Sequence, residues 1–276
     1  MARYPNSHFL ICGDAGTRKS TLAAMFPKPI FVFQMDSYAK AMPYRRKGLQ
    51  GEQGELVTVQ GMEQSGGVIP YELIMNPKKE DQVLFRIEHF QTADVSQGVD
   101  YIYAFENFLA RLPSIQQEVR QGQWATVVFD SLSSLAYEAR KLDEYKMNPA
   151  IEEGRKAHGM QSYGAAARAI EELVRSNLSS MRCNVVLLGH LQVERDALGN
   201  VTDHWPAAPG QLSRQLPGVF PESYIVHAEA DGANWLQTQS GNGYVATTQI
   251  PAPNGCEATY KAIWSQLEAE FNKGDE

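Results

Sequence analysis

Residues 13–21 have the sequence GDAGTRKST, which combines a glycine-rich turn with a lysine and three hydroxyl side chains. In such a turn, at the start of a helix, successive backbone N–H groups can point at phosphate oxygens. Lys19 would then contact the β- and γ-phosphates of a nucleotide, and the Ser20 hydroxyl would ligate Mg²⁺. The alternative is a glycine turn in which Ser20 or Thr21 only caps a helix. The predicted nucleotide-binding residues are Gly13, Asp14, Ala15, Gly16, Thr17, Arg18, Lys19, Ser20 and Thr21.

Arg18 departs from the usual form of this motif, G-x-x-x-x-G-K-[ST], because it stands where the second glycine is expected. If the backbone there requires a positive φ, a residue other than glycine costs on the order of 1 kcal/mol, which a well-supported loop tolerates. If the position is already helical, the cost is small and Arg18 adds a second cation near the phosphates. Either outcome leaves the loop able to bind a nucleotide.

Two aspartates follow apolar runs that are typical of buried strands. The run TVVFD (126–130) ends in Asp130, which could face a Mg²⁺-bound water or could simply cap the next helix. The run PKPIFVFQMD ends in Asp36, which could orient the water that attacks the γ-phosphate or could belong to a turn. Together with Ser20, Asp130 is the predicted metal ligand, and Asp36 and Lys19 are predicted to be catalytic.

His190 and two tyrosines complete the candidate site. His190 follows the apolar run CNVVLLG and could donate a hydrogen bond to the γ-phosphate and relay its presence to the next loop; a structural histidine is the alternative. Tyr38 or Tyr44 could stack on adenine, and we take Tyr44 as the candidate.

The elements that carry these residues alternate between apolar strand-like runs and amphipathic helical stretches. This pattern predicts an α/β fold with a mostly parallel central sheet and helices on both faces. Ligands of such sheets bind at the carboxyl ends of the strands, where Gly13, Asp36, Asp130 and His190 all fall. We expect one domain over residues 1–276, with a β-rich insertion at 55–92, a C-terminal β-hairpin made by the segments ANWLQTQ and GYVATTQ, and a C-terminal helix at 255–276.

Composition narrows the class of protein. The chain has 276 residues, 43% of them hydrophobic, with no apolar run that approaches a membrane span. The three cysteines lie far apart, so neither a disulfide framework nor a zinc site is indicated. We expect a cytoplasmic protein that is not bound to a membrane. The net charge of −7 argues against nucleic-acid binding over the whole surface, although eight of the 25 Lys and Arg residues precede residue 48.

Beyond these separate motifs, the stretches GDAGTRKSTLAAMFPKPIFVFQMD, TVVFDSLSSL and NVVLLGHLQVERD occur in an order that resembles the RecA-like ATPases of bacteriophages. That group includes short, core-only proteins associated with single-strand annealing and recombination. The resemblance covers about residues 7–250 and implies a RecA-like P-loop core with ATP and Mg²⁺ as cofactors. It matches Lys19 and Ser20 to the Walker A pair and Asp130 to the Walker B acid. Asp36 falls where the family usually has glutamate, and His190 where it has a glutamine sensor.

The resemblance also implies two loops that contact single-stranded DNA. They would lie at about 146–162, with Arg155 and Lys156, and at about 192–211, with Arg195, His204 and Trp205. Stacking aromatic rings and cations suit single strands, but both loops also contain acids, and Trp205 could equally pack onto the core. Expected partners are single-stranded DNA, further copies of this chain in a filament or ring, and a single-strand-binding protein.

Three functions follow from these observations. The first is an ATP-dependent recombination or annealing protein of phage type, in which ATP binding and slow hydrolysis control assembly on single-stranded DNA. The GYVATTQ segment lacks the basic residues that RecA-like proteins use across a subunit interface, so hydrolysis is expected to be weak unless Arg214 substitutes. The second is a nucleotide-gated protein-interaction module. The third, a small-molecule kinase, is disfavoured because no lid-like arginine cluster is found.

Overall fold

The computed structural model describes residues 6–36, 44, 57–63, 69–76, 78–90, 104–146 and 159–265. Its strands are β1 (His8–Cys12), β2 (Ile30–Gln34), β3 (Val57–Glu63), β4 (Ile69–Asn76), β5 (Lys79–His89), β6 (Thr126–Asp130), β7 (Asn184–Gly189), β8 (Leu191–Arg195), β9 (Val201–Pro206), β10 (Glu222–Ala228), β11 (Asn234–Gln237) and β12 (Cys256–Glu257). Its helices are α1 (Lys19–Ala23), α2 (Ala104–Arg120), α3 (Leu132–Lys146), α4 (Gly159–Glu172), the π-helical η4 (Leu173–Leu178) and α5 (Leu212–Val219).

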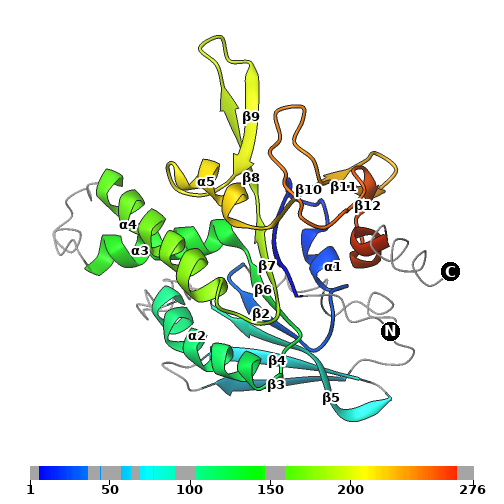
Figure 1. Ribbon diagram of the computed structural model, residues 1–276. Coiled ribbons are helices and arrows are strands. Elements are labelled where there is room, and N and C mark those ends of the chain that lie inside the picture. Colours follow the sequence, from blue (N-terminus) through cyan, green and yellow to red (C-terminus); the bar gives the residue numbers. More distant parts are fainter. Residues whose placement is uncertain are drawn as a thin grey trace.

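The central sheet has ten strands in the order β12-β11-β10-β1-β7-β6-β2-β5-β4-β3 (Figure 1). The neighbours from β10 to β5 pair in parallel, and the strands outside them pair antiparallel. Strand β7 lies between β1 and β6, so the glycine-rich loop after β1 and the aspartate at the end of β6 emerge at the same edge of the sheet. The predicted α/β class with a mostly parallel sheet is confirmed.

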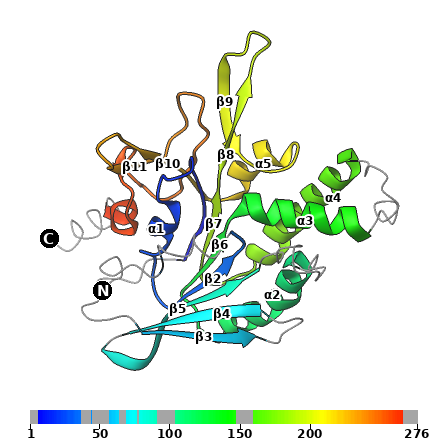
Figure 2. The same cartoon turned by 180° about the vertical axis from the view of Figure 1, so that it is seen from behind.

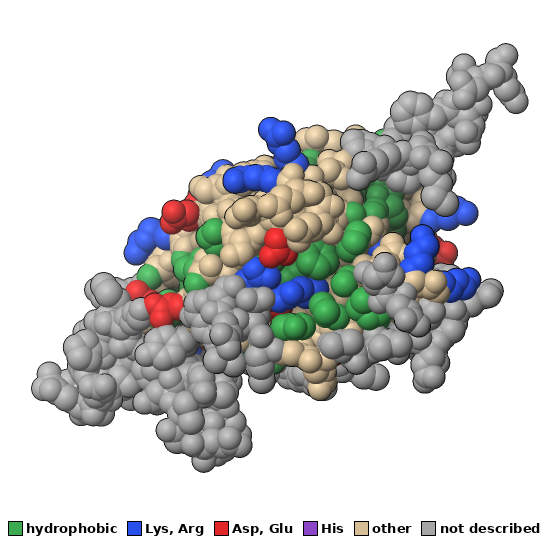
Figure 3. Space-filling model, turned by 90° about the horizontal axis from the view of Figure 1, so that it is seen from below, with side chains coloured by type: hydrophobic (Ala, Val, Ile, Leu, Met, Phe, Trp, Pro, Cys, Tyr) green, Lys and Arg blue, Asp and Glu red, His purple; other side chains and the backbone are tan. Residues whose placement is uncertain are grey.

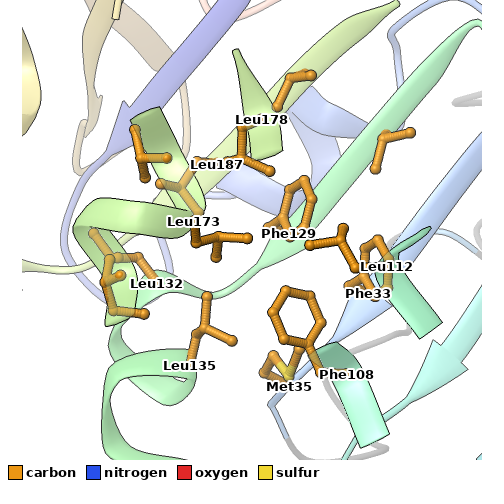
Figure 4. Packing of buried hydrophobic residues seen from close by; sticks show 14 of the residues in the cluster. Phe33, Met35, Phe108, Leu112, Phe129, Leu132, Leu135, Leu173, Leu178 and Leu187 are labelled. Carbon is orange, nitrogen blue, oxygen red and sulfur yellow. The ribbon is translucent and has the colours of Figure 1, made fainter. Parts of the chain in front are cut away.

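Each face of the sheet is covered, which explains why the central strands are apolar throughout. Every second residue of the central strands packs on one face beneath α2, α3, α4 and α5. Phe33 and Phe129 are examples, and their rings stack with 4.9 Å between the centroids (Figure 4). The opposite face packs against Leu22 of α1 and against Trp264 in the helical residues 260–265. Helices therefore cover both faces, as Figures 1 and 2 show.

Strands β3, β4 and β5 fall within the segment predicted to be β-rich. Strand β5 joins the parallel sheet beside β2, and β4 and β3 continue it as an antiparallel extension. Glu88 of β5 is fully buried and accepts hydrogen bonds at 3.0 Å from the Arg111 guanidinium, so this extension is fastened to α2. Figure 3 views this end of the molecule and shows hydrophobic and basic side chains next to one another.

Two expectations about local structure need correction. The C-terminal hairpin consists of β10 and β11, with the short β12 paired to β11, whereas residues 243–249 form no strand. Gly243 has a φ of 76°, which breaks an extended backbone, and its carbonyl accepts a hydrogen bond from His204 N instead. The segment 192–211 is also not an irregular loop. Most of it forms the β8–β9 hairpin, which projects from the molecule (Figure 1).

The hairpin turn explains why this segment is ordered. The Asp196 carboxylate accepts hydrogen bonds at 2.8 Å from the backbone N–H groups of Leu198 and Asn200, and Gly199 adopts a φ of 85°. An aspartate that bonds to the backbone ahead of it and a glycine with positive φ are a common way to reverse a chain. None of the helices in the described parts of the chain is both long and apolar enough to cross a membrane.

Candidate functional site

The glycine-rich loop leaves β1 and enters α1 through a tightly packed turn. A Cβ atom on Gly13 would lie 2.6 Å from the carbonyl oxygen of Val226 and 2.7 Å from the hydroxyl of Thr17, so only glycine fits. Gly16 has a φ of 84° and is exposed together with Asp14 and Ala15. The loop is therefore anchored at Gly13 and open to solvent at its tip.

Arg18 occupies the left-handed backbone region, with φ 61° and ψ 32°. Of the two outcomes left open by the sequence, the strained one holds, since a side chain costs on the order of 1 kcal/mol there. The side chain is exposed and extends toward the β10–β11 turn, where a Cβ on Gly232 would lie 3.7 Å from Arg18 Nη2. Arg18 thus keeps the backbone shape of the usual glycine and adds a cation beside the loop.

The Lys19 ammonium lies within the loop. Its Nζ atom donates hydrogen bonds to the carbonyl oxygens of Gly13 at 2.9 Å and Asp14 at 2.8 Å. The side chain is buried, and burial lowers the pKa of Lys19, while nearby carboxylates, including those of Asp130 and Asp36, raise that pKa in opposition. The ammonium is therefore held at the centre of the loop, close enough to both aspartates for their negative charges to act on it.

Asp130 is the buried acid at the carboxyl end of β6. Its Oδ2 atom accepts hydrogen bonds from Ser20 Oγ at 2.7 Å and from Tyr44 Oη at 2.9 Å. Burial raises the pKa of Asp130 to about 6, and the charge of Asp36 adds to that rise, while the two hydroxyl donors and Lys19 oppose it. The predicted metal ligands Ser20 and Asp130 are thus in direct contact.

Asp36 lies beside Asp130, because its backbone N–H donates to the Asp130 carbonyl oxygen at 3.3 Å. The Asp36 carboxylate accepts hydrogen bonds from Ser131 Oγ at 3.3 Å and from Ser134 Oγ, both in the segment that starts α3. These contacts fix the orientation of the carboxylate. The structure therefore brings Lys19, Ser20, Asp36 and Asp130 together at one edge of the sheet.

The donor set suits a magnesium–nucleotide complex. Mg²⁺ prefers oxygen ligands and usually binds one or two protein oxygens together with water and phosphate. Ser20 Oγ and Asp130 Oδ2 supply such oxygens 2.7 Å apart. The backbone N–H groups of the exposed loop tip and the Lys19 ammonium can donate hydrogen bonds to phosphate oxygens. The residues present therefore fit Mg²⁺ and a triphosphate.

His190 lies between β7 and β8, at the base of the β8–β9 hairpin. Its backbone N–H lies 3.4 Å from Ser133 Oγ, and its carbonyl oxygen accepts a hydrogen bond from Ala207 N at 2.7 Å. Ser133 also donates to the Ala207 carbonyl oxygen at 3.4 Å. His190 thus connects the hairpin to the first turn of α3, whose neighbouring serines hold Asp36.

Tyr44 does not lie where it could stack on adenine. It is fully buried, its ring centroid is 6.0 Å from that of Phe85, and its hydroxyl donates to Asp130. The position of Tyr44 is a correction to the sequence-based prediction. The apolar surroundings that the ring needs are available beside β5, and its hydroxyl then partners a buried carboxylate.

The residues predicted to contact nucleic acid are only partly brought together. Arg195, His204 and Trp205 all lie on the β8–β9 hairpin, whereas Arg155 and Lys156 lie outside the described residues. Each described residue has a partner within the chain. The Arg195 guanidinium donates to Gly199 O at 2.8 Å, His204 stacks on Tyr244 at 4.1 Å, and Trp205 Nε1 donates to Glu194 at 2.9 Å.

Sequence reasoning missed two features of the site. Ser131 and Ser134 were not predicted to be part of the site, although the dense run SLSSL directly after Asp130 is a visible signal. Gln34 was overlooked because it ends an apolar run. It is fully buried, and neither its amide nitrogen nor its oxygen has a hydrogen-bond partner among the described residues.

Comparison with known proteins identifies the domain. A family model described as an AAA domain matches residues 6–250. No curated protein matches the chain. A KaiC-like protein from Pyrococcus horikoshii OT3 is similar with 12% identity and a TM-score of 0.39, over 89% of this chain and 84% of that one. An ATPase from the type III secretion system of pathogenic bacteria is similar with 12% identity and a TM-score of 0.41, over 81% of this chain and 52% of that one. Neither likeness is close enough to carry an argument.

Replacing Arg18 with glycine is expected to stabilise the fold. Relief of the left-handed strain recovers about 1–2 kcal/mol, while the added freedom of the unfolded chain costs about 0.4–1 kcal/mol. The net gain in the free energy of unfolding is therefore about 1 kcal/mol, measured by urea denaturation. Gly16→Ala is the matched control at a position of positive φ, and it should destabilise by about 1 kcal/mol. A loss of stability in Arg18→Gly would show that contacts of the Arg18 side chain outweigh the strain.

The raised pKa of Asp130 predicts a pH-dependent effect of Asp130→Asn. The folded state binds the Asp130 proton more tightly than the unfolded state does. The stabilisation of the fold by this proton is therefore complete below the ordinary pKa of about 4, and it is lost as the pH rises through about 6. Asparagine removes the titration and can still accept both hydroxyl hydrogen bonds. The variant should therefore gain stability over the wild type between pH 4 and 7, by up to about 3 kcal/mol.

Thermal denaturation of the wild type and of Asp130→Asn from pH 4 to pH 8 measures the difference in stability between them. Groups that titrate in both proteins contribute equally and cancel in this difference. Asp196→Asn is the control, and its stability relative to the wild type should change with pH in the opposite direction, because the hydrogen bonds from Asn200 lower the pKa of Asp196. A gap between Asp130→Asn and wild type that stays constant with pH would contradict the raised pKa.

Proposed function

We propose, from the premise that this chain belongs to the AAA domain family, that it binds ATP with Mg²⁺ and hydrolyses it slowly. The chain is a P-loop ATPase-type nucleotide-binding domain with a RecA-like fold. The observation that carries the proposal is the convergence of Lys19, Ser20, Asp36 and Asp130 at the carboxyl edge of the sheet. These are the groups that phosphoryl transfer to water requires.

The roles of the residues follow from their contacts. The Lys19 ammonium, which now bonds to loop carbonyls, can exchange them for phosphate oxygens without leaving the loop. Ser20 and Asp130 supply oxygen ligands to Mg²⁺, which when bound neutralises charge on the phosphates. Asp36, held by Ser131 and Ser134, orients the attacking water and accepts its proton.

Slow hydrolysis is proposed because the described residues place few cations near the phosphates. Arg18 and Lys19 belong to the loop itself. Arg214, the candidate for an arginine acting between subunits, instead pairs with Glu194 of its own chain, and both side chains are partly exposed. An arginine held in this way would have to leave Glu194 before it could reach a neighbouring copy. ATP binding would then act mainly as a switch for assembly into a filament or ring.

The proposed setting for this switch is a recombination or annealing protein of phage type, working on single-stranded DNA in the host cytoplasm, with a single-strand-binding protein as a further partner. The β8–β9 hairpin supports this proposal, because it projects beside the nucleotide site and carries Arg195, His204 and Trp205. Its base contacts the turn of α3 whose serines hold Asp36. The hairpin is thus connected to the site that would sense the γ-phosphate.

A nucleotide-gated protein-interaction module is the second candidate. Trp205 Nε1 donates to Glu194, which also pairs with Arg214, so the ring and the cation are bonded within the chain rather than directed outward. The hairpin also exposes aliphatic side chains, with Leu198 87% exposed. Apolar side chains on a projecting hairpin suit a protein partner better than a polyphosphate strand.

Lys19→Ala is expected to weaken ATP binding by about 100-fold, because a charged hydrogen-bond partner of the phosphates is worth up to about 3 kcal/mol. Isothermal titration calorimetry measures the loss. Arg175→Ala removes an exposed cation that pairs with Glu171 and should bind ATP like the wild type. Asp130→Asn should keep Mg²⁺-free binding and lose the gain that Mg²⁺ brings. Unchanged affinity in Lys19→Ala would refute the nucleotide site.

Filter binding of a labelled DNA single strand, with and without ATP and Mg²⁺, separates the two candidate functions. We expect retention that requires ATP with Mg²⁺ and falls as salt rises, because counterions are released from the phosphates. Arg195→Ala should lower the affinity, whereas Arg120→Ala, at the far end of α2, should not. ATP binding without retention of DNA at low salt would favour the protein-interaction module.

A further inference from the structure

Two half-exposed tyrosines and two cations form a surface on α3 and α4 that the nucleotide site does not use. We call Tyr137, Arg140, Lys141 and Tyr163 the tyrosine–arginine surface. Tyr137 is 47% and Tyr163 is 49% exposed, which is unusual for large aromatic side chains in the described part of the chain. Tyr137, Arg140 and Lys141 are three and four residues apart, so they share one helix face.

The cations and rings of this surface alternate. The Arg140 guanidinium lies 5.4 Å from the ring centroid of Tyr137 and 4.9 Å from that of Tyr163. Lys141 Nζ lies 4.5 Å from the Tyr137 ring, and Arg140 also donates to the Tyr163 hydroxyl. Arg140 further pairs with Glu144 at 3.4 Å, which leaves Lys141 as the less neutralised charge.

A pocket of about 270 Å³ opens beside these side chains. Ala136, Ala208 and Pro209 give it apolar walls, and Gln192 at the base of the hairpin adds an amide. A mainly apolar pocket edged by aromatic rings, with cations next to it, matches a base and its phosphate better than it matches an aliphatic protein surface.

We propose that the tyrosine–arginine surface binds single-stranded nucleic acid, with a base stacked on a tyrosine ring and the backbone phosphate at Lys141 and Arg140. The proposal rests on the proposed function and gives it a location other than the hairpin residues that the sequence suggested. Each of those residues has another partner within the chain, whereas the two tyrosine rings remain half exposed. The hairpin, with Arg195, would then lie along the bound strand and add to the affinity, while the bases stack on the tyrosine rings.

The test uses the full chain, ATP with Mg²⁺ and a fluorescein-labelled oligo(dT) single strand, with binding read by anisotropy. Tyr137→Ser with Tyr163→Ser should weaken binding about tenfold or more, and the paired Tyr→Phe variant should retain it, because the rings stack without their hydroxyls. Lys141→Ala should reduce the salt dependence. Leu198→Ser, at the hairpin tip, is the control for loss of an exposed apolar side chain and should bind like the wild type.

A second readout locates the contact. Ultraviolet crosslinking to a strand that contains 5-iodouracil should attach it to Tyr137 or Tyr163. Full binding by the double serine variant would overturn this surface and leave the proposed function standing. A double variant that binds DNA normally but sediments as a smaller species would show instead an interface between copies. A wild-type chain that binds no strand would overturn the DNA function and this surface with it.

Gln34 supports an independent inference about the nucleotide site. It pairs in register with Asp130 on β6, and residues in register on parallel strands direct their side chains to the same face. Val32 and Ile30, two and four residues earlier, pack with Leu22 of α1, so this face is the one that carries α1 and the loop. Gln34 therefore lies beside Asp130 on the nucleotide side of the sheet.

The burial of this amide is costly. Gln34 is fully buried, and both of its polar side-chain atoms lack hydrogen-bond partners among the described residues. Buried polar groups are nearly always bonded, and one that is not loses its hydration without replacement. We infer that Gln34 is a positioning residue, whose amide hydrogen-bonds to water held by Asp130 when Mg²⁺ and ATP are bound. This inference also rests on the proposed function.

Gln34→Met, a substitution of similar shape, tests it. If the amide serves only the bound state, the variant should have a Tm equal to or above that of the wild type, because an unsatisfied polar group is removed. Its Tm increase on addition of Mg²⁺ and ATP should be smaller, while the increase with ATP alone should be unchanged. Turnover should fall about tenfold or more.

Gln237→Met is the matched control. The Gln237 amide is also buried, but it donates to Gln239 O at 2.9 Å and to Gly241 O at 3.0 Å. Its loss should lower the Tm and leave the response to Mg²⁺ and ATP intact. A lower Tm in Gln34→Met, or an unchanged response to Mg²⁺ and ATP, would overturn the role of Gln34. A wild-type chain without that response would overturn the proposed function as well.

Discussion

The contact between Ser20 and Asp130 is the interaction on which the site depends. It joins the start of α1 to the end of β6 across the intervening strand β7, with 2.7 Å between the two oxygens. A buried carboxylate is costly, and the raised pKa of Asp130 measures that cost. The hydroxyls of Ser20 and Tyr44 and the charge of Lys19 offset part of it. The free energy that this burial costs is consistent with the proposed role of Asp130 as a cation ligand.

Much of the fold is predictable because the central strands obey simple rules. Strands β1, β2, β6 and β7 are continuous apolar runs since both faces of the sheet are covered. Parallel connection places their carboxyl ends at one edge, so Lys19, Asp36 and Asp130 could be expected to meet without knowledge of the strand order. The glycine-rich loop has a geometry fixed by local residues, and Arg18 retains that geometry despite its side chain.

The parts that could not be predicted depend on partners that are distant in sequence. Nothing near Tyr44 indicates that its hydroxyl reaches Asp130, because that contact needs the packing beside β5. The hairpin formed by β8 and β9 has a visible turn signal at Asp196, but its charged and polar residues conceal the alternation of a strand. Whether Trp205 is free to stack likewise depends on Glu194, eleven residues away on the opposite strand.

The attachment of this hairpin has a mechanical consequence. Ser133 contacts both of its strands at their base, through His190 N and Ala207 O, and sits one residue from Ser134, which holds Asp36. The two strands pair with each other, and midway along them His204 N donates to Gly243 O and Glu194 pairs with Arg214. A shift at the serine turn would therefore displace the hairpin together with the loop at Gly243 and the start of α5. A rearrangement around the Asp36 carboxylate would thus be transmitted along the hairpin.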